Sequence, residues 1–236
     1  MSPLSGCSAD RGHPMKEDRI KTYIRGLDEQ MQGGVPTGHV VLVAGRPGTM
    51  KSSLAFNILY RNALEEEMSG LYVTLEQSRE SLLSMMKGLG MDASVVDKYL
   101  CVLDLGLIRK KLKQLGAKSW IEVFKMYVDN MDKSMDLDIM AIDSLPVLEV
   151  MSKFVEPRED LFRVMEWLRD LGLTTFVIAE MQQDSNKFCN HGEDFLSDGI
   201  IHLDLRREDN NVNLFLGVVK MRKTAHRRGY YPLIFD

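Results

Sequence analysis

The chain has 236 residues, and 30 lysines and arginines against 34 aspartates and glutamates give a net charge of −4. Hydrophobic residues make up 44% and charged residues 27%, which excludes wholesale disorder, and no apolar run reaches the ~18 residues that span a bilayer. The slight acidity argues against general nucleic-acid binding.

The first residues differ from the rest of the chain. Residues 1–19 lack apolar periodicity and the apolar stretch of a secretory signal, so we expect a flexible N-terminal extension before one domain over 20–236. The three cysteines, Cys7, Cys101 and Cys189, are odd in number and far apart. That spacing predicts no disulfide framework and favours a reducing, cytoplasmic compartment.

From His39 onward, short apolar runs alternate with longer amphipathic stretches. The predicted strands cover residues 39–44, 71–75, 99–103, 138–143 and 174–179. The predicted helices cover 51–65, about 119–130 and 159–171, and a further helix follows a cap at Ser78. Strands that alternate with helices imply an α/β fold with a mainly parallel sheet flanked by helices.

In the C-terminal part of the chain, the alternation of predicted strands and helices ends. Residues 200–205 and 212–220 flank the polar turn 206–211, which predicts a β-hairpin, and 230–235 are expected to add a short strand. The sheet should therefore carry an antiparallel extension at its C-terminal edge.

A glycine-rich loop lies between the first predicted strand and its helix. Its sequence, Gly45-Arg46-Pro47-Gly48-Thr49-Met50-Lys51-Ser52, follows the phosphate-loop pattern of Gly, four residues, Gly, Lys and Ser or Thr, except that Met50 replaces the second glycine. Such a loop surrounds a β-phosphate with backbone N–H groups at a helix N-terminus. The alternative is a Gly/Pro turn before a helix that happens to begin with Lys and Ser. Candidate nucleotide-binding residues are Gly45, Pro47, Gly48, Thr49, Met50, Lys51, Ser52 and Ser53.

Two carboxylates complete the expected site. Lys51 should bridge the β- and γ-phosphates, while Ser52, and Asp143 through water, would hold Mg²⁺. Asp143 ends an apolar strand, where a metal-water ligand is needed. Glu76 follows the second strand and is assigned as the general base that polarises the attacking water. The alternative for Glu76 is an acid that merely opens a helix.

These residues belong to an ordered set that resembles the KaiC-like ATPases of the RecA superfamily, in single-domain form. The segments that carry the resemblance are Ile24-Arg25-Gly26-Leu27-Asp28, Gly33 to Gly38, Gly45 to Ser53, Val73 to Glu76, Asp143-Ser144, Ser197 to Ile201 and Lys220 to His226. The resemblance thus covers nearly the whole chain from about residue 20.

The resemblance implies a homo-oligomeric ring, usually a hexamer, with ATP between adjacent subunits. Lys220 and Arg222 match a basic finger that reaches the γ-phosphate of the neighbouring subunit's ATP, and His226 matches a residue near the nucleotide. The alternative is a solvated basic stretch from Lys220 to Arg228. Gln77 stands where the family often has a second acid, so slow turnover is expected.

The function that follows is a slow, ring-forming ATPase, with ATP and Mg²⁺ as ligands, in a regulatory or signalling role. One alternative is a DNA-binding recombinase paralogue on the same fold. The two loops that would face a ring channel, about 149–160 and 182–194, are not the basic, aromatic segments that single strands prefer. The other alternative, motivated by Met50 and Gln77, is an ATP-sensing scaffold with negligible turnover.

Overall fold

The fold is taken from a computed structural model that describes residues 19–108, 120–181, 188, 192–208 and 211–234. Most strands of these residues join one large sheet. They are β3 (Val40–Gly45), β4 (Gly70–Thr74), β5 (Leu100–Asp104), β6 (Ile139–Asp143), β7 (Thr174–Glu180), β8 (Gly199–Glu208), β9 (Asn211–Met221) and β10 (Tyr230–Pro232). Their order in the sheet is β10-β9-β8-β3-β7-β6-β4-β5.

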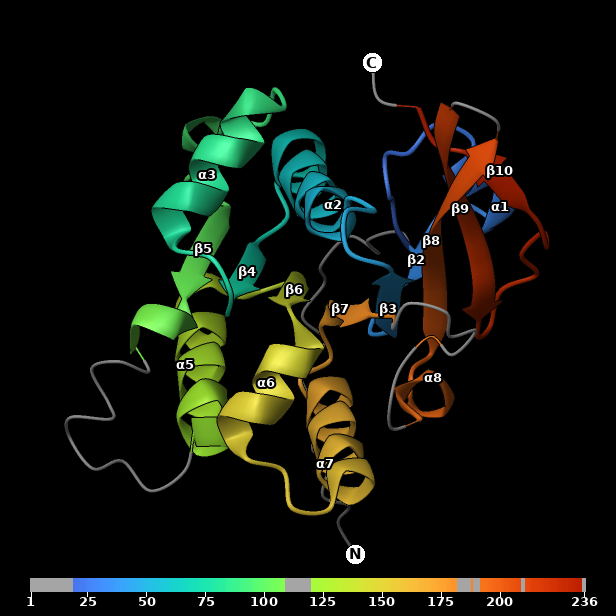
Figure 1. Cartoon of the computed structure of the whole chain (residues 1–236). Coiled ribbons are helices and arrows are strands. Elements are labelled where there is room, and N and C mark those ends of the chain that lie inside the picture. Colours follow the sequence, from blue (N-terminus) through green and yellow to red (C-terminus); the bar gives the residue numbers. More distant parts are fainter. Residues whose placement is uncertain (1–18, 109–119, 182–187, 189–191, 209–210, 235–236) are drawn as a thin grey trace, which may run out of the picture.

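Helices cover both faces of the sheet, as Figure 1 shows. One face carries α2 (Lys51–Glu66) and α3 (Arg79–Gly88), and the other carries α5 (Trp120–Met135), α6 (Leu145–Ser152) and α7 (Pro157–Asp170). The predicted cap is confirmed, because the Ser78 hydroxyl accepts a hydrogen bond from the N–H of Ser81 at 3.2 Å. The α/β class inferred from the sequence is likewise confirmed.

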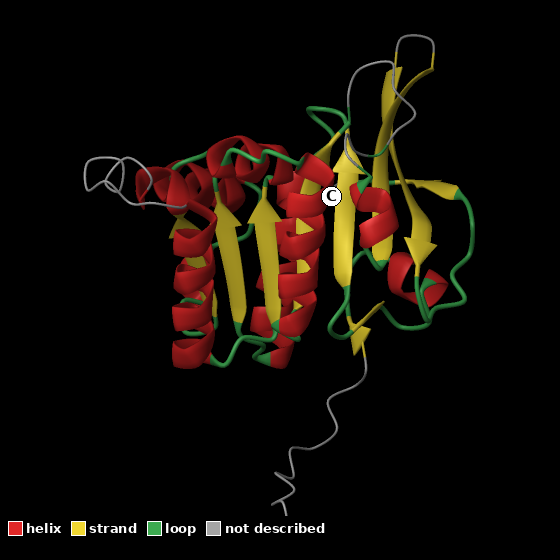
Figure 2. Ribbon diagram, turned by 90° about the horizontal axis from the view of Figure 1, so that it is seen from below, coloured by secondary structure: helices red, strands yellow, loops and turns green. Residues whose placement is uncertain are grey.

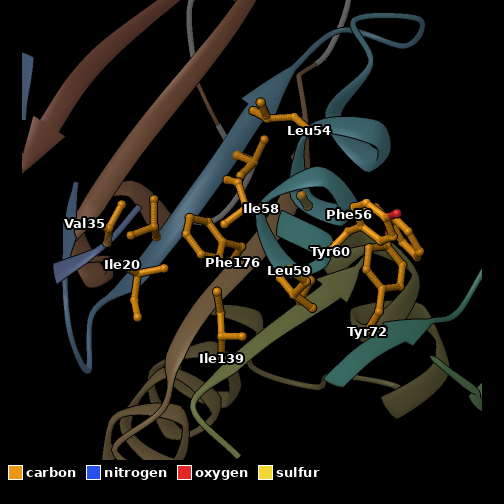
Figure 3. Packing of buried hydrophobic residues seen from close by; sticks show 14 of the residues in the cluster. Ile20, Val35, Leu54, Phe56, Ile58, Leu59, Tyr60, Tyr72, Ile139 and Phe176 are labelled. Carbon is orange, nitrogen blue, oxygen red and sulfur yellow. The ribbon is translucent and has the colours of Figure 1, made fainter. Parts of the chain in front are cut away.

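The central strands are apolar because both of their faces are covered. All six residues of β3 are buried, and β3 pairs in parallel with both β7 and β8. The side chains of the sheet divide between two hydrophobic clusters, one under α2 and α3 and one under α5, α6 and α7. Figure 3 shows the first, where Phe56 and Ile58 of α2 lie over Phe176 and Tyr72 of the strands. The parallel sheet brings the carboxyl ends of β3, β4, β6 and β7 to one edge.

The predicted antiparallel extension at the C-terminal edge is confirmed, because β8 and β9 form the expected hairpin. β8 pairs in parallel with β3 on one side and antiparallel with β9 on the other, and β10 pairs antiparallel with β9. Figure 2 shows β8 and β9 as a long ribbon that projects beyond the helical layers.

The short elements were not predicted from the sequence, because they span too few residues to show a regular spacing of apolar side chains. They are β1 (Arg19–Ile20), α1 (Leu27–Gln30), β2 (Val35–Pro36), η1 (Ala93–Val95) and α8 (Glu193–Leu196). β1 and β2 pair with each other in a separate small sheet.

The interpretation of residues 149–160 as a loop is wrong. The end of α6 and the start of α7 occupy most of it, which leaves residues 153–156 as the connection. The apolar sequence of α6 directly follows apolar β6, so no change of period separates them, although Pro146 fits a first helical turn.

The segments 1–18, 109–119 and most of 182–191 lie outside the described residues. Among the residues described, no helix combines the length and the apolar character needed to cross a membrane.

Candidate functional site

The glycine-rich loop folds tightly on itself between β3 and α2. The carbonyl oxygen of Arg46 accepts hydrogen bonds from the N–H of Thr49 at 3.3 Å, the Thr49 hydroxyl at 2.8 Å and the Lys51 ammonium at 3.0 Å. A side chain at Gly45 would place its Cβ 2.6 Å from the Thr49 hydroxyl oxygen, so only glycine fits there. The loop is thus fixed at the carboxyl edge of the sheet.

Met50 occupies a glycine-like backbone conformation. Its φ is +63° and its ψ is +28°, in the left-handed region, directly before α2 begins at Lys51. This conformation costs an L-residue with a Cβ roughly 1–2 kcal/mol. The geometry therefore explains why glycine is expected at this position, and the chain accommodates methionine at a cost.

We predict that Met50→Gly raises the free energy of unfolding by up to about 1 kcal/mol, because relief of the left-handed conformation outweighs the extra freedom of glycine in the unfolded chain. Met85→Gly is the matched control, since Met85 is an exposed methionine within α3 and its replacement should lower the free energy by about 1 kcal/mol. Chemical denaturation of both variants measures the difference. A loss at Met50 as large as that at Met85 would contradict the strain argument.

Asp143, at the end of β6, is only 5% exposed and lies among hydroxyl groups. Tyr72 donates to its Oδ2 at 2.6 Å, and the Ser52 hydroxyl lies close enough to act on the pKa of the carboxyl group. Burial raises the pKa of Asp143, while these hydroxyl groups and the Lys51 charge oppose that rise. Hydroxyl and carboxylate oxygens are the ligands that Mg²⁺ prefers, and this cation keeps several waters and phosphate oxygens. The donor set therefore fits magnesium, and within the described part of the chain no group of three or more His, Cys, Asp or Glu offers a full protein cage.

Lys51 is buried beside three carboxylates. Burial lowers the pKa of its ammonium group, and the charges of Glu180, Asp143 and Glu76 act in the opposite direction. Glu180 ends β7 and pairs in register with Gly45, which places it beside the loop. Glu180 was not among the predicted site residues, although it ends an apolar strand in the same way as Asp143.

Glu76 lies directly beyond β4, where the ends of β4 and β6 meet. The N–H of Leu75 donates to the carbonyl of Asp143 at 2.7 Å, and the buried Ser144 hydroxyl donates a short hydrogen bond to Glu76 Oε1. The side chain of Glu76 itself is exposed. The structure thus brings Lys51, Ser52, Asp143 and Glu76 to one edge of the sheet.

The structure does not bring every predicted site residue to the glycine-rich loop. The exceptions are Lys220, Arg222 and His226. Met221 pairs with Gly199, which pairs with Val41 near the start of β3, whereas the loop follows Gly45 at the other end of that strand. Val41 and Gly45 are four residues apart along β3, which corresponds to about 13 Å. One subunit therefore does not bring the basic residues to its own loop.

Lys220 and Arg222 are held by the chain around α8. The Lys220 ammonium donates to the carbonyls of Asp194 at 2.8 Å and Ser197 at 2.6 Å, and Arg222 pairs with Asp198 at 2.8 Å. Burial acts to raise the pKa of Asp198, but the Val40 N–H and the Arg222 guanidinium outweigh it and hold that pKa below its usual value. Burial, with the neighbouring Arg222 charge, lowers the pKa of Lys220. His226 contacts the Thr224 carbonyl at 3.4 Å through Nδ1.

The family model described as "ATPase: KaiC" matches residues 20–236. The chain belongs to the KaiC family of ATPases. A solved KaiC-like protein from the archaeon Pyrococcus horikoshii has a TM-score of 0.78 at 28% identity, covering 91% of this chain and 93% of that chain. The RecA-type KaiC fold inferred from the motifs is confirmed, and membership of this ATPase family implies that the chain binds ATP.

Relatives of two lengths match this KaiC-family chain. A UPF0273 protein from Aeropyrum pernix is 29% identical over 229 residues, which cover 91% of this chain and 89% of the relative. The circadian clock oscillator protein KaiC of a Picosynechococcus species is 28% identical over 232 residues, which cover 95% of this chain and 44% of that protein. The chain thus spans less than half the length of the clock proteins that it matches.

Proposed function

We propose that this chain binds ATP with Mg²⁺ at the loop of residues 45–53 and hydrolyses it slowly. The observation that carries the proposal is the convergence of Lys51, Ser52, Asp143 and the hydrogen-bonded Ser144–Glu76 pair at one sheet edge. Backbone N–H groups from Gly45 to Ser53 would surround the β-phosphate, and Lys51 would exchange the Arg46 carbonyl for phosphate oxygens. Bound Mg²⁺, held by Ser52 and through water by Asp143, would offset charge on the β- and γ-phosphates.

Glu76 is proposed to act as the general base. A water oxygen attacks the γ-phosphorus, the bond from that phosphorus to the bridging oxygen of ADP breaks, and the proton of the water passes to the Glu76 carboxylate. The Ser144 hydroxyl supports this role because it fixes one oxygen of Glu76. Met50 and Gln77 favour a slow rate, the first through the shape of the loop and the second because no second acid follows Glu76.

The nucleoside is proposed to lie beside the first turns of α2. A hollow of about 730 Å³ adjoins the loop there and is lined by Ser53, Leu54 and Asn57 from α2 and by Leu89 and Ile234 from other segments. Its volume is in the usual range of small-molecule sites. The hollow supports the proposal because its lining includes Ser53, the last of the residues assigned to the nucleotide.

Lys220 and Arg222 are proposed to serve a neighbouring subunit. Their distance from Lys51 in one subunit supports an arrangement in a ring, where each subunit supplies its basic finger to the next. A ring that binds ATP at every subunit interface could change its state when ATP is bound or hydrolysed. Such a ring suits a regulatory switch.

Lys51→Ala tests the function as a whole. We expect ATP binding to weaken by at least 100-fold and phosphate release to vanish, because the lysine contacts the transferred phosphoryl group. Binding of a fluorescent ATP analogue, phosphate release and particle size with and without Mg·ATP should be measured together. Tight, Lys51-dependent binding without release would favour the ATP-sensing scaffold, and a monomer with no turnover would contradict the ring ATPase.

A further inference from the structure

Tyr72 combines a core position with a polar contact at the proposed metal site. Its side chain is fully buried in β4, and its ring packs against Phe56 with 5.4 Å between centroids. Figure 3 shows the rings of Phe56 and Tyr60, both from α2, close to the ring of Tyr72. Tyr72 pairs in register with Ala141, and Asp143 lies two residues further along β6 on the same face. The Tyr72 hydroxyl therefore reaches Asp143 across the two strands.

The hydroxyl has a role that packing does not explain. A phenylalanine would fill the same space against Phe56, while a buried hydroxyl is costly unless it has a partner. Here the partner is the Asp143 carboxylate at 2.6 Å, the short distance of a charge-assisted hydrogen bond. The Ser52 hydroxyl acts on the pKa of both Tyr72 and Asp143, so it lies close to this hydrogen-bonded pair.

We propose that Tyr72 is a positioning residue for magnesium: its hydroxyl holds Oδ2 of Asp143, so that this proposed metal-binding carboxylate is fixed beside Ser52 before the metal arrives. The inference rests on the proposed function, because Ser52 and Asp143 are the residues assigned there to Mg²⁺. Groups that orient metal ligands through hydrogen bonds typically change metal affinity by about 10–100-fold when they are removed.

Tyr72→Phe tests the inference, with Tyr60→Phe as the matched control. Tyr60 is another buried tyrosine that stacks on Phe56, with 6.5 Å between ring centroids, and the described hydrogen bonds include none from its hydroxyl to Asp143 or Ser52. Binding of a fluorescent ATP analogue is measured at fixed pH, first in EDTA and then during titration with Mg²⁺. We expect Tyr72→Phe to raise the half-saturating Mg²⁺ concentration about 10-fold and to leave affinity in EDTA unchanged. Tyr60→Phe should alter neither value.

Each outcome separates the inference from the function on which it rests. Equal Mg²⁺ titrations for the wild type and Tyr72→Phe would overturn the inference alone. Wild-type ATP binding that ignores Mg²⁺ would overturn the magnesium site and the inference with it. Binding that depends on Mg²⁺ without phosphate release would contradict only the proposed hydrolysis, and a weaker Mg²⁺ response of Tyr72→Phe would still support the role of Tyr72.

A second measurement avoids dependence on the folding of the Phe variant. In wild-type protein that carries 3-fluorotyrosine at position 72, the ¹⁹F resonance should shift when Mg²⁺ is added to the ATP-bound protein, because the phenol bonds directly to a metal-binding carboxylate. The same label at position 60 should not respond. Resonances at both positions that ignore Mg²⁺ would overturn the inference.

Discussion

Replacement of Glu76 by Gln should lower phosphate release by about 100- to 10,000-fold, while ATP affinity stays within about threefold of the wild-type value. Glutamine keeps the size of the side chain and can still meet the Ser144 hydroxyl, but it does not accept the proton of the attacking water. Because Glu76 is exposed at the sheet edge and the phosphates are proposed to be held by Lys51, ATP binding should survive. Single-turnover phosphate release, measured beside binding of an ATP analogue, separates the two effects.

Two further variants make the Glu76 result specific. Glu65→Gln removes a carboxylate of α2 that pairs with Arg61 at 2.9 Å on the surface, and it should leave turnover unchanged. Ser144→Ala should slow turnover by a smaller factor, because it frees Glu76 without removing its carboxylate. If Glu76→Gln kept its activity, the base would have to be sought at Glu180, whose charge also acts on Lys51.

The parallel core of the fold was predictable because burial on both faces leaves continuous apolar runs. The strand before the loop, the loop itself and the start of α2 at Lys51 all follow from local residue order. The α6 helix was missed because its first turn continues the apolar character of β6, and only the position of Pro146 distinguishes it. The spacing of apolar residues therefore predicts a helix or strand where that spacing changes from one element to the next. It does not separate two elements where the spacing stays the same.

Only those parts of the site that lie within single sequence motifs were predictable from the sequence. Lys51, Ser52 and Asp143 belong to motifs with recognisable spacing, whereas the contact of Tyr72 with Asp143 depends on which strand lies beside β6. In the sequence Tyr72 is an ordinary aromatic residue of a buried strand. Glu180 is different, because it ends an apolar strand as Asp143 does and is therefore predictable from the sequence.

The basic finger leads to the prediction with the largest effect. Arg222→Ala should lower turnover by about 1,000-fold or more, because an arginine that neutralises charge on the transferred phosphoryl group contributes 10³–10⁵ in rate. Arg228→Ala is the control, since it removes the same charge from the same basic run, and it should change turnover little. Melting temperature and particle size must be measured as well, because loss of Arg222 removes an ion pair of Asp198, although Arg169 still lies 3.4 Å from that carboxylate.

Mixing experiments then decide which subunit the finger serves. Lys51→Ala subunits have a defective loop and an intact finger, and Arg222→Ala subunits have the reverse, so each alone should be inactive. In a head-to-tail ring assembled from equal amounts of both, about a quarter of the interfaces combine an intact loop with an intact finger, and turnover should recover to about a quarter of the wild-type value. A finger that acts within its own subunit predicts no recovery, because no subunit then has both parts. Mixed rings that stay inactive would therefore contradict the arrangement that the opposite placement of Lys51 and Arg222 suggests.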